Sequence, residues 1–342
     1  MKSSTRGIRL LTATAAWFAA LAFLSACGGG ASGGGAAAPL PPPPVQQSSM
    51  FVTDAYQNAV LVFPESANGN VSPASYLAGS NTALAGPSGI AVSANGTIYV
   101  TNALNDSVTI YAAGASGNAA PSTIIAGSAT ELDAPVGIAV AANGTVVVAN
   151  SGTTSGTPSI TEYAPGANGN AAPTSVIAGA ATTLDRPGYL TLDAAGNIYV
   201  ANLLGNSVAV FASGATGNAA PARQIVGAQT QLANPDGIAL DANGRIYVAN
   251  DGNGYSVTVY SSVAAGNAAP LAVLAGSNTA LYNPSGIAVN GLGTLFVADT
   301  TAFGSYGGVT LYAPGAFGNV GYNAVVSGGN TGFVRPAGIA LH

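Results

Sequence analysis

Short apolar runs alternate with glycine, proline and polar turns along most of this 342-residue chain, and one such pattern recurs. It reads P-S-G-I-A-V-S-A-N-G-T-I-Y-V-T-N at residues 87–102. Close copies begin at later prolines, the last one truncated by the end of the chain: Pro135, Pro187, Pro235, Pro284 and Pro336. The gaps between successive prolines are 48, 52, 48, 49 and 52 residues, which indicates one repeat array rather than two ordinary domains.

Each repeat predicts four short strands. In the repeat that starts at Pro87 they are residues 89–92, 97–101, 107–111 and 122–126. The first two are joined by a turn around Asn95-Gly96, a hairpin signal because both residues accept a positive φ. The array has no segment with the three-and-four spacing of apolar residues that a helix needs. Four antiparallel strands per repeat are typical of one β-propeller blade.

The array begins and ends at different strands of the repeat. Residues 50–54 align with the second strand of the repeat, and residues 338–341 align with the first. The blades are complete only if the C-terminal strand joins the N-terminal blade, which also removes an exposed strand edge. The sequence therefore predicts an all-β, six-bladed propeller over residues 50–342, closed by its C-terminal strand.

The N-terminus predicts a secretory signal. Three basic residues lie in the first ten positions, and an apolar stretch at 11–24 follows, too short for a typical membrane span. Leu24-Ser25-Ala26-Cys27 then resembles the lipobox of bacterial lipoproteins. The resemblance implies that residues 1–26 are removed and that Cys27 carries lipid. An ordinary signal peptide with an incidental cysteine is the alternative.

Residues 27–49 are rich in glycine and proline, and we expect them to form a tether, part flexible coil and part polyproline II. Gly28 is not the aspartate that is associated with inner-membrane retention of lipoproteins. The lipoprotein resemblance therefore implies export across the inner membrane and an anchor in the outer membrane, on either of its sides.

The repeat also resembles a known family. P-x-G-I-A-V-D-x-x-G-x-I-Y-V-A-D/N, followed by an S-V-x-V-Y/F strand, is similar to the NHL repeat over residues 50–342. NHL-type and similar six-bladed propellers include amidating lyases, lactonases and streptogramin lyases, and others bind proteins or RNA. This chain departs from the family pattern, because asparagine stands at most aspartate positions and the third strand has no basic residue.

Composition narrows the possible functions. Only 6% of residues are charged and 48% are hydrophobic, as expected for strands buried on both faces. Without the signal, twelve acidic residues stand against four arginines, a net charge of −8. Four dispersed arginines cannot form the basic stripe that binding to phosphate requires, so we expect no nucleic-acid partner.

Catalytic chemistry has few candidate residues. The only histidine is the terminal His342 and the only cysteine is Cys27, so we predict neither a transition-metal site nor a hydrolytic triad, and no cofactor. The three glutamates of the body are scattered, and two are expected on the face away from the Pro-x-Gly loops. Catalysis is therefore disfavoured; the alternative is a divalent-metal-dependent lyase or lactonase-like hydrolase at the channel mouth.

The second strands all end in a carboxylate or amide side chain, and we expect these six to lie on the face of the Pro-x-Gly loops: Asp54, Asn102, Asn150, Asn202, Asn250 and Asp299. They could form a ring of ligands for a metal or sugar. They could instead cap the following turns through the backbone, as such residues do well. Recurrence in every blade favours the structural role.

Positions where a blade departs from the repeat are better candidates for functional residues than the six recurrent carboxylate and amide positions. The fourth blade, whose copy begins at Pro187, reads Gly188-Tyr189 where most first strands open with glycine. The loops at 151–158, 251–255 and 300–308 are longer than the corresponding loop at 103–106. The resulting candidates for ligand binding on this loop face are Tyr56, Arg186, Tyr189, Tyr255, Phe303 and Tyr306. Aromatic and amide groups suit a protein, peptide or carbohydrate ligand, although ordinary loop packing is the alternative. The leading prediction is a lipid-anchored, cell-envelope binding module without catalysis.

Overall fold

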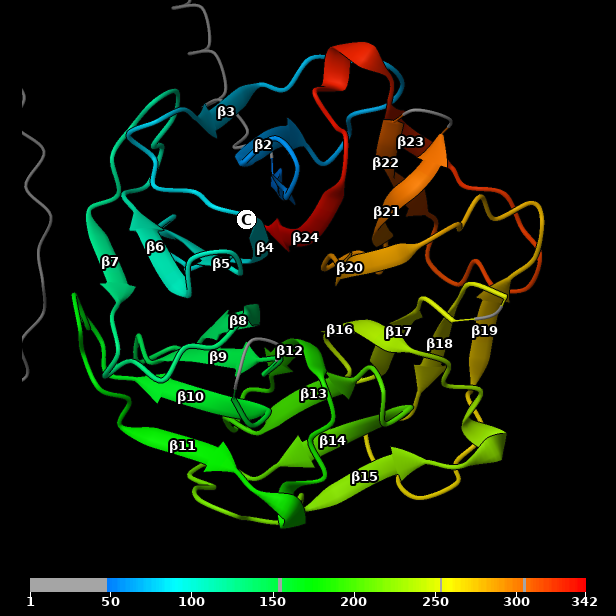
Figure 1. Cartoon of the computed structure of the whole chain (residues 1–342). Coiled ribbons are helices and arrows are strands. Elements are labelled where there is room, and N and C mark those ends of the chain that lie inside the picture. The colour runs from blue at the N-terminus through cyan, green and yellow to red at the C-terminus, as the bar shows by residue number, and fades with distance from the viewer. Residues whose placement is uncertain (1–47, 153–155, 253, 304–305) are drawn as a thin grey trace, which may run out of the picture. The chain divides into compact units, whose positions relative to one another are not determined.

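The computed structural model describes residues 48–152, 156–252, 254–303 and 306–342, apart from the side chains of 302 and 303. Within these ranges the chain forms six four-stranded antiparallel sheets arranged in a ring around a central axis (Figure 1), along which the innermost strands line a channel. The predicted six-bladed β-propeller is thereby confirmed.

Each sheet is one blade, numbered here from the N-terminus, and its strands follow one another outward from the channel. Blade 1 contains β24 (Pro336–Leu341), β1 (Ser49–Asp54), β2 (Ala59–Pro64) and β3 (Ser75–Ala78). Blade 2 contains β4 (Pro87–Val92), β5 (Ile98–Asn102), β6 (Ser107–Tyr111) and β7 (Thr123–Ala126). Blade 3 contains β8 (Pro135–Val140), β9 (Val146–Asn150), β10 (Ser159–Tyr163) and β11 (Ser175–Ala178).

The remaining blades repeat this order. Blade 4 contains β12 (Pro187–Leu192), β13 (Ile198–Asn202), β14 (Ser207–Phe211) and β15 (Arg223–Val226). Blade 5 contains β16 (Pro235–Leu240), β17 (Ile246–Asn250), β18 (Ser256–Tyr260) and β19 (Ala272–Ala275). Blade 6 contains β20 (Pro284–Val289), β21 (Leu295–Phe303), β22 (Tyr306–Tyr312) and β23 (Ala324–Ser327). Three short 3₁₀ turns follow outer strands: η1 (Ala180–Thr182), η2 (Ala228–Thr230) and η3 (Gly329–Thr331).

The C-terminal strand closes the ring. β24 pairs with β1 through Met50↔Leu341, Phe51↔Ala340 and Val52↔Ile339, so the two ends of the chain share one sheet. Two backbone bonds extend the pairing, from Ser49 N to the His342 carbonyl and from His342 N to the Ser49 carbonyl. The closure predicted from the phase of the array is confirmed.

The turn between the first two strands differs from the prediction in its backbone. Gly96 has a φ of +82°, and its N–H donates to the Ser93 carbonyl at 2.7 Å. Asn95 does not take a positive φ, so the expectation that both residues would do so is wrong for Asn95. Its side chain instead accepts a hydrogen bond from the Thr97 N–H at 3.1 Å, which holds the turn in place.

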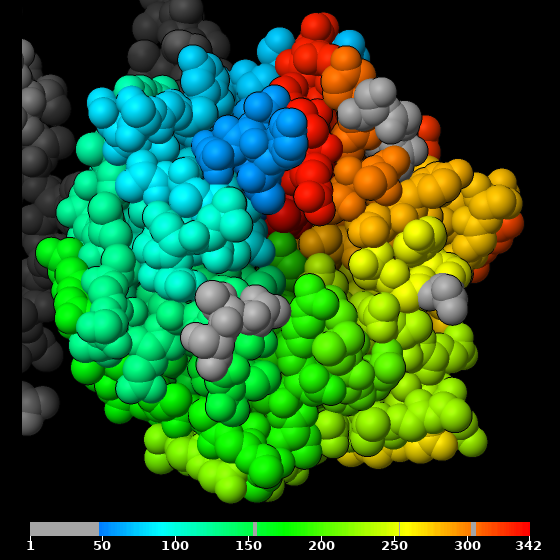
Figure 2. Space-filling view, in the orientation of Figure 1, coloured from blue at the N-terminus to red at the C-terminus, as the bar shows by residue number. Residues whose placement is uncertain are grey.

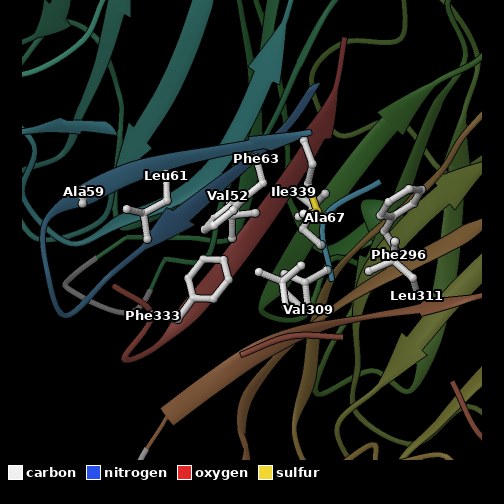
Figure 3. Close-up of a cluster of buried hydrophobic side chains, with 13 residues drawn as sticks. Val52, Ala59, Leu61, Phe63, Ala67, Phe296, Val309, Leu311, Phe333 and Ile339 are labelled. Atoms are coloured by element: carbon white, nitrogen blue, oxygen red, sulfur yellow. The ribbon is translucent and has the colours of Figure 1, made fainter. Parts of the chain in front are cut away.

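Apolar side chains fill the seams between neighbouring blades. At the seam between blades 6 and 1, residues of β1, β2 and β24 face residues of β21 and β22 (Figure 3). The rings of Phe63 and Phe333 lie 5.1 Å apart there, at 45° to each other. Each blade is therefore buried on both faces, which accounts for the near-continuous apolar strands.

A repeated Gly-Asn turn ties each blade to the one before it. The side-chain oxygen of Asn118 in blade 2 accepts a hydrogen bond from the Asn81 N–H of blade 1 at 2.8 Å. The same bond recurs around the ring, with these asparagines as acceptors: Asn70, Asn170, Asn218, Asn267 and Asn319. Because Asn70 accepts from Asn330 N, the outer edge of the ring is closed as well as the inner one.

Candidate functional site

A β-bulge opens every innermost strand. In blade 2, Pro87 pairs with Asn102 and Ile90 pairs with Val100, so Ser88 and Gly89 together face only Thr101. The same register shift occurs in the other five blades. A bulge of this kind re-aims side chains locally. It explains why the residue after each proline reaches the channel.

Those six residues line one cavity at the loop face, which we call the central funnel: Ser88, Val136, Gly188, Asp236, Ser285 and Ala337. Its volume is about 480 Å³, within the range of about 300–1,000 Å³ that is typical of small-molecule sites. Figure 2 shows the propeller hollowed at its centre, where blades from both ends of the colour scale meet. All six blades contribute to the lining, so the central funnel exists only in the closed ring.

Tyr189 forms the floor of the central funnel. Its phenol oxygen interacts with the hydroxyls of Ser88 on β4 and Ser285 on β20, each two blades away, so the side chain crosses the channel. Burial raises the pKa of this tyrosine, as does the charge of Asp236, while the two serines lower it. Past Tyr189, the channel continues as a separate cavity of about 340 Å³ with a largely aliphatic lining. Tyr189 thus separates a compartment lined by charged side chains from one lined mainly by aliphatic residues.

The fourth blade makes room for this side chain by moving its glycine one position earlier. A Cβ added to Gly188 would lie 2.6 Å from Asp236 Oδ1 and 2.9 Å from the Asp236 carbonyl oxygen. Gly188 therefore makes the close approach to blade 5, and Tyr189 is free to project into the channel. The departure from the repeat that the sequence singled out has this physical basis.

Asp236 places a carboxylate on the wall of the central funnel. Ser285 Oγ donates a 2.9 Å hydrogen bond to its Oδ2. Burial raises the pKa of Asp236 to about 6, with the Ser285 hydrogen bond opposing the shift. The charge of Asp251 raises this pKa further and that of Arg186 lowers it, so both groups lie within electrostatic range of Asp236.

Asp251 lines the central funnel from the same blade. Its Oδ1 atom is buried and has no hydrogen-bond partner among the described residues. Burial raises the pKa of this carboxyl, and the negative charge of Asp299 raises it further. A buried carboxylate oxygen without a donor is costly. Asp251 therefore contributes a second carboxyl group to the wall of the cavity, beside Asp236.

Two arginines lie at the mouth of the central funnel. Arg186 and Arg335 each precede the proline of an innermost strand, in blades 4 and 1, which are opposite in the ring. Both are exposed, and within the described ranges neither guanidinium has a hydrogen bond or ion pair. The other two described arginines are engaged away from the funnel, Arg223 with the Ala264 carbonyl and Arg245 with Asp241.

The carboxylate and amide side chains that end the second strands lie outside this cavity. All six are buried: Asp54, Asn102, Asn150, Asn202, Asn250 and Asp299. Asn102 Oδ1 accepts from Ala85 N at 3.0 Å, and the same bond to the loop before the proline recurs in the other blades. Asp54 also accepts from Tyr56 N and Gln57 N. These bonds fix the loop backbone that carries the arginines.

The other predicted binding residues are dispersed over the loop face. Tyr56 is 70% exposed and Tyr306 is 41% exposed, and neither lines the central funnel. Tyr255 lines a neighbouring open groove of about 740 Å³ between blades 4 and 5, with its ring 6.5 Å from that of Tyr282. The side chain of Phe303 and the whole of Cys27 lie outside the described residues. Of the six candidates, the structure brings Arg186 and Tyr189 together.

Sequence reasoning missed Asp236, Asp251, Ser285 and Arg335. A signal for two of them was present, because the position after the proline reads Ser, Val, Gly, Asp, Ser and Ala while its neighbours barely change. Within the described ranges, no three His, Cys, Asp or Glu side chains are grouped closely enough to hold a metal ion. The same ranges contain no helix with the length and apolar character needed to cross a membrane.

No protein-family model matches the chain, and no curated protein matches it. Solved structures do match the chain. A protein of unknown function from Bacteroides caccae aligns with a TM-score of 0.62 and 11% identity, over 86% of this chain and 99% of that one. The structure of a nidogen/laminin complex aligns with a TM-score of 0.61 and 15% identity, over 86% and 98%. A virginiamycin B lyase from Staphylococcus aureus aligns with a TM-score of 0.48 and 11% identity, over 80% and 83%.

At such low identities the first two alignments show a shared fold alone, and a propeller fold hosts many unrelated functions. The fold and the site together define the chain as a six-bladed β-propeller whose channel opens at the loop face as a polar funnel with an aromatic floor.

Proposed function

We propose that the protein is a lipid-anchored, cell-envelope binding module of the NHL-repeat type, which takes its ligand in the central funnel without catalysis. The observation that carries this proposal is the concentration of non-repeated side chains there. The repeat supplies the scaffold in every blade, whereas Tyr189, Asp236, Arg186 and Arg335 each occur at positions where most blades have other residues. Binding sites usually break the symmetry of the scaffold that holds them.

The described part of the chain begins on the face of the propeller opposite the central funnel. Asp54, at the end of β1, pairs with Pro336 at the loop face, so Ser49 at the start of β1 lies at the opposite end of the strand.

A pull-down from an envelope extract tests the binding role. The wild-type protein is expected to retain a component that the Tyr189→Ala variant loses, because the variant removes the funnel floor. Tyr76→Ala is the matched control, since Tyr76 is 54% exposed on β3 and does not line the funnel. Equal retention by wild type and Tyr189→Ala would overturn the proposal that the ligand enters the central funnel.

Membrane fractionation tests the anchor. The wild-type chain is expected in the outer-membrane fraction after cleavage before Cys27, whereas a Cys27→Ser variant has no thiol for lipid attachment. The variant should lose lipid labelling and fail to mature at that position. If the wild-type protein incorporates no labelled fatty acid, the lipoprotein assignment is wrong, while the binding role can still be judged by the pull-down.

A further inference from the structure

The central funnel contains both signs of charge, on different walls. Asp236 and Asp251 come from blade 5, while Arg186 and Arg335 come from blades 4 and 1. The site therefore has no net charge when all four groups are ionised. A ligand of a single charge would be attracted by one pair of groups and repelled by the other.

Each of these charges is incompletely satisfied within the protein. Arg335 has no side-chain partner in the described ranges, and Oδ1 of Asp251 is buried without a donor. Asp236 receives one hydrogen bond from Ser285 on Oδ2 and shares the electrostatic field of Asp251. An ammonium group beside the two carboxylates would relieve their mutual repulsion, and a carboxylate beside Arg335 would give that guanidinium a bidentate partner.

The rest of the lining suits an apolar substituent. Ala55, Ala103, Leu104, Val136 and Leu203 line the side of the central funnel formed by blades 1 to 4. Below them, the hydroxyls of Tyr189, Ser88 and Ser285 can each donate or accept a hydrogen bond at the floor. A neutral sugar could use these hydroxyls, but it would leave the arginines and Asp251 without charged partners.

We propose that the central funnel binds a small zwitterion, a free α-amino acid or a short peptide. Its ammonium group lies beside Asp236 and Asp251, its carboxylate beside Arg335, and its apolar side chain against the alanine and leucine wall. This inference rests on the binding role proposed above and names the class of ligand for that same site.

Calorimetric titration of the full-length protein in detergent tests the charge requirement. The probes are L-leucine and L-alanyl-L-leucine, with L-leucinamide lacking the carboxylate and N-acetyl-L-leucine lacking the ammonium. A zwitterion is expected to bind about tenfold or more tightly than either singly charged analogue, because each analogue loses a charge-assisted contact. Tighter binding of the dipeptide than of leucine would identify a peptide as the source of the zwitterion.

Substitutions test which side chain of the protein binds the carboxylate of the ligand and which binds its ammonium group. Arg335→Gln should weaken leucine binding to the level of leucinamide while leaving leucinamide binding unchanged. Asp236→Asn should weaken leucine to the level of N-acetyl-leucine, and Ser285→Ala, which removes only the donor to Asp236, provides a milder second variant. Arg245→Gln is the control, because Arg245 pairs with Asp241 away from the funnel. Thermal unfolding of each variant checks that the propeller is intact.

Two results would overturn the inference. One is equal or absent binding of all four probes, and the other is tighter binding of glucose or glucuronate than of either zwitterion. If either occurs while the envelope pull-down still depends on Tyr189, the ligand class is wrong and the binding role stands. If the pull-down is also independent of Tyr189, both proposals fail.

Discussion

Gly237 packs against Ser285 of the next blade so closely that a Cβ added to Gly237 would lie 2.0 Å from the Ser285 carbonyl oxygen. The equivalent glycines of other blades make the same approach, with 2.3 Å at Gly89 and 2.1 Å at Gly286. The obstacle is backbone rather than a movable side chain. Glycine at this position is therefore a requirement of ring closure, and its replacement by Tyr189 in blade 4 depends on Gly188.

Gly237→Ala should destabilise the propeller by about 3 kcal/mol or more, because the methyl group forces two innermost strands apart. Thermal or denaturant unfolding measures the loss. Gly291→Ala is the matched control, since a Cβ there meets nothing within 4 Å, and it should change stability by less than about 0.5 kcal/mol. Similar stability of the two variants would contradict the packing argument.

Asp236 should make the protein less stable as the pH rises from about 4 to 7. Its pKa is about 6 in the folded protein against an ordinary value of 3.8, so the folded state holds the proton more tightly. Between these two pKa values the unfolded state binds fewer protons than the folded state. The free energy of unfolding therefore falls by up to about 3 kcal/mol as the pH rises through this range. The Asp236→Asn variant lacks this loss, so its melting temperature should rise relative to wild type across that window and then level off.

Asp193 provides the control of opposite sign. Burial raises the pKa of Asp193, but hydrogen bonds from Asn197, Ala195 and Tyr199 together outweigh it and lower the pKa below its ordinary value. The contribution of Asp193 to stability is therefore present above the ordinary pKa and is lost as the pH falls. Asp193→Asn should therefore lose stability relative to wild type at neutral pH and converge with it in acid. A pH-independent difference for Asp236→Asn would show that Asp236 does not titrate in this window.

Removal of residues 336–342 should open the ring. The deletion takes away β24, leaves the edge of β1 without its partner and uncovers the seam containing Phe63 and Phe333. We expect aggregation or a large fall in unfolding temperature, together with fast hydrogen exchange at residues 50–52. His342→Ala should behave like wild type, because the bonds of His342 to Ser49 are made by its backbone. A monomeric, equally stable truncation would refute the closure.

A buried tyrosine anchors the loop after the fourth strand in four blades. Tyr163 OH donates to the Thr130 carbonyl at 2.5 Å, and burial raises its pKa to about 12. Tyr163→Phe should cost about 1 to 2 kcal/mol, because the buried carbonyl loses its donor while packing is kept. Blades 1 and 4 already have Phe63 and Phe211 at this position, so the variant should fold. Tyr76→Phe, on an exposed tyrosine, is the control and should be neutral.

The fold was predictable because the same local pattern of strands and turns recurs in every blade. Apolar runs of four to six residues bounded by glycine and proline specify strands, and the phase difference between residues 50–54 and 338–341 specifies closure. The function of the Gly-Asn turn was not predictable in this way. Asn118 makes its hydrogen bond to a residue of the preceding blade, 37 positions away, and no local pattern reports that partner.

The candidate site was likewise predictable from the sequence only in part. The sequence by itself determined the strands, the order of the blades and the position where the repeat departs from its pattern, Gly188-Tyr189, because these depend on residues that are neighbours in the chain. Only the tertiary structure decided which side chains share the central funnel. Arg186, Asp236, Ser285 and Arg335 are separated by about fifty residues from one blade to the next, and curvature of the closed ring brings them to one cavity. The aromatics Tyr56 and Tyr306 lie on the same face, yet the ring holds them outside that cavity.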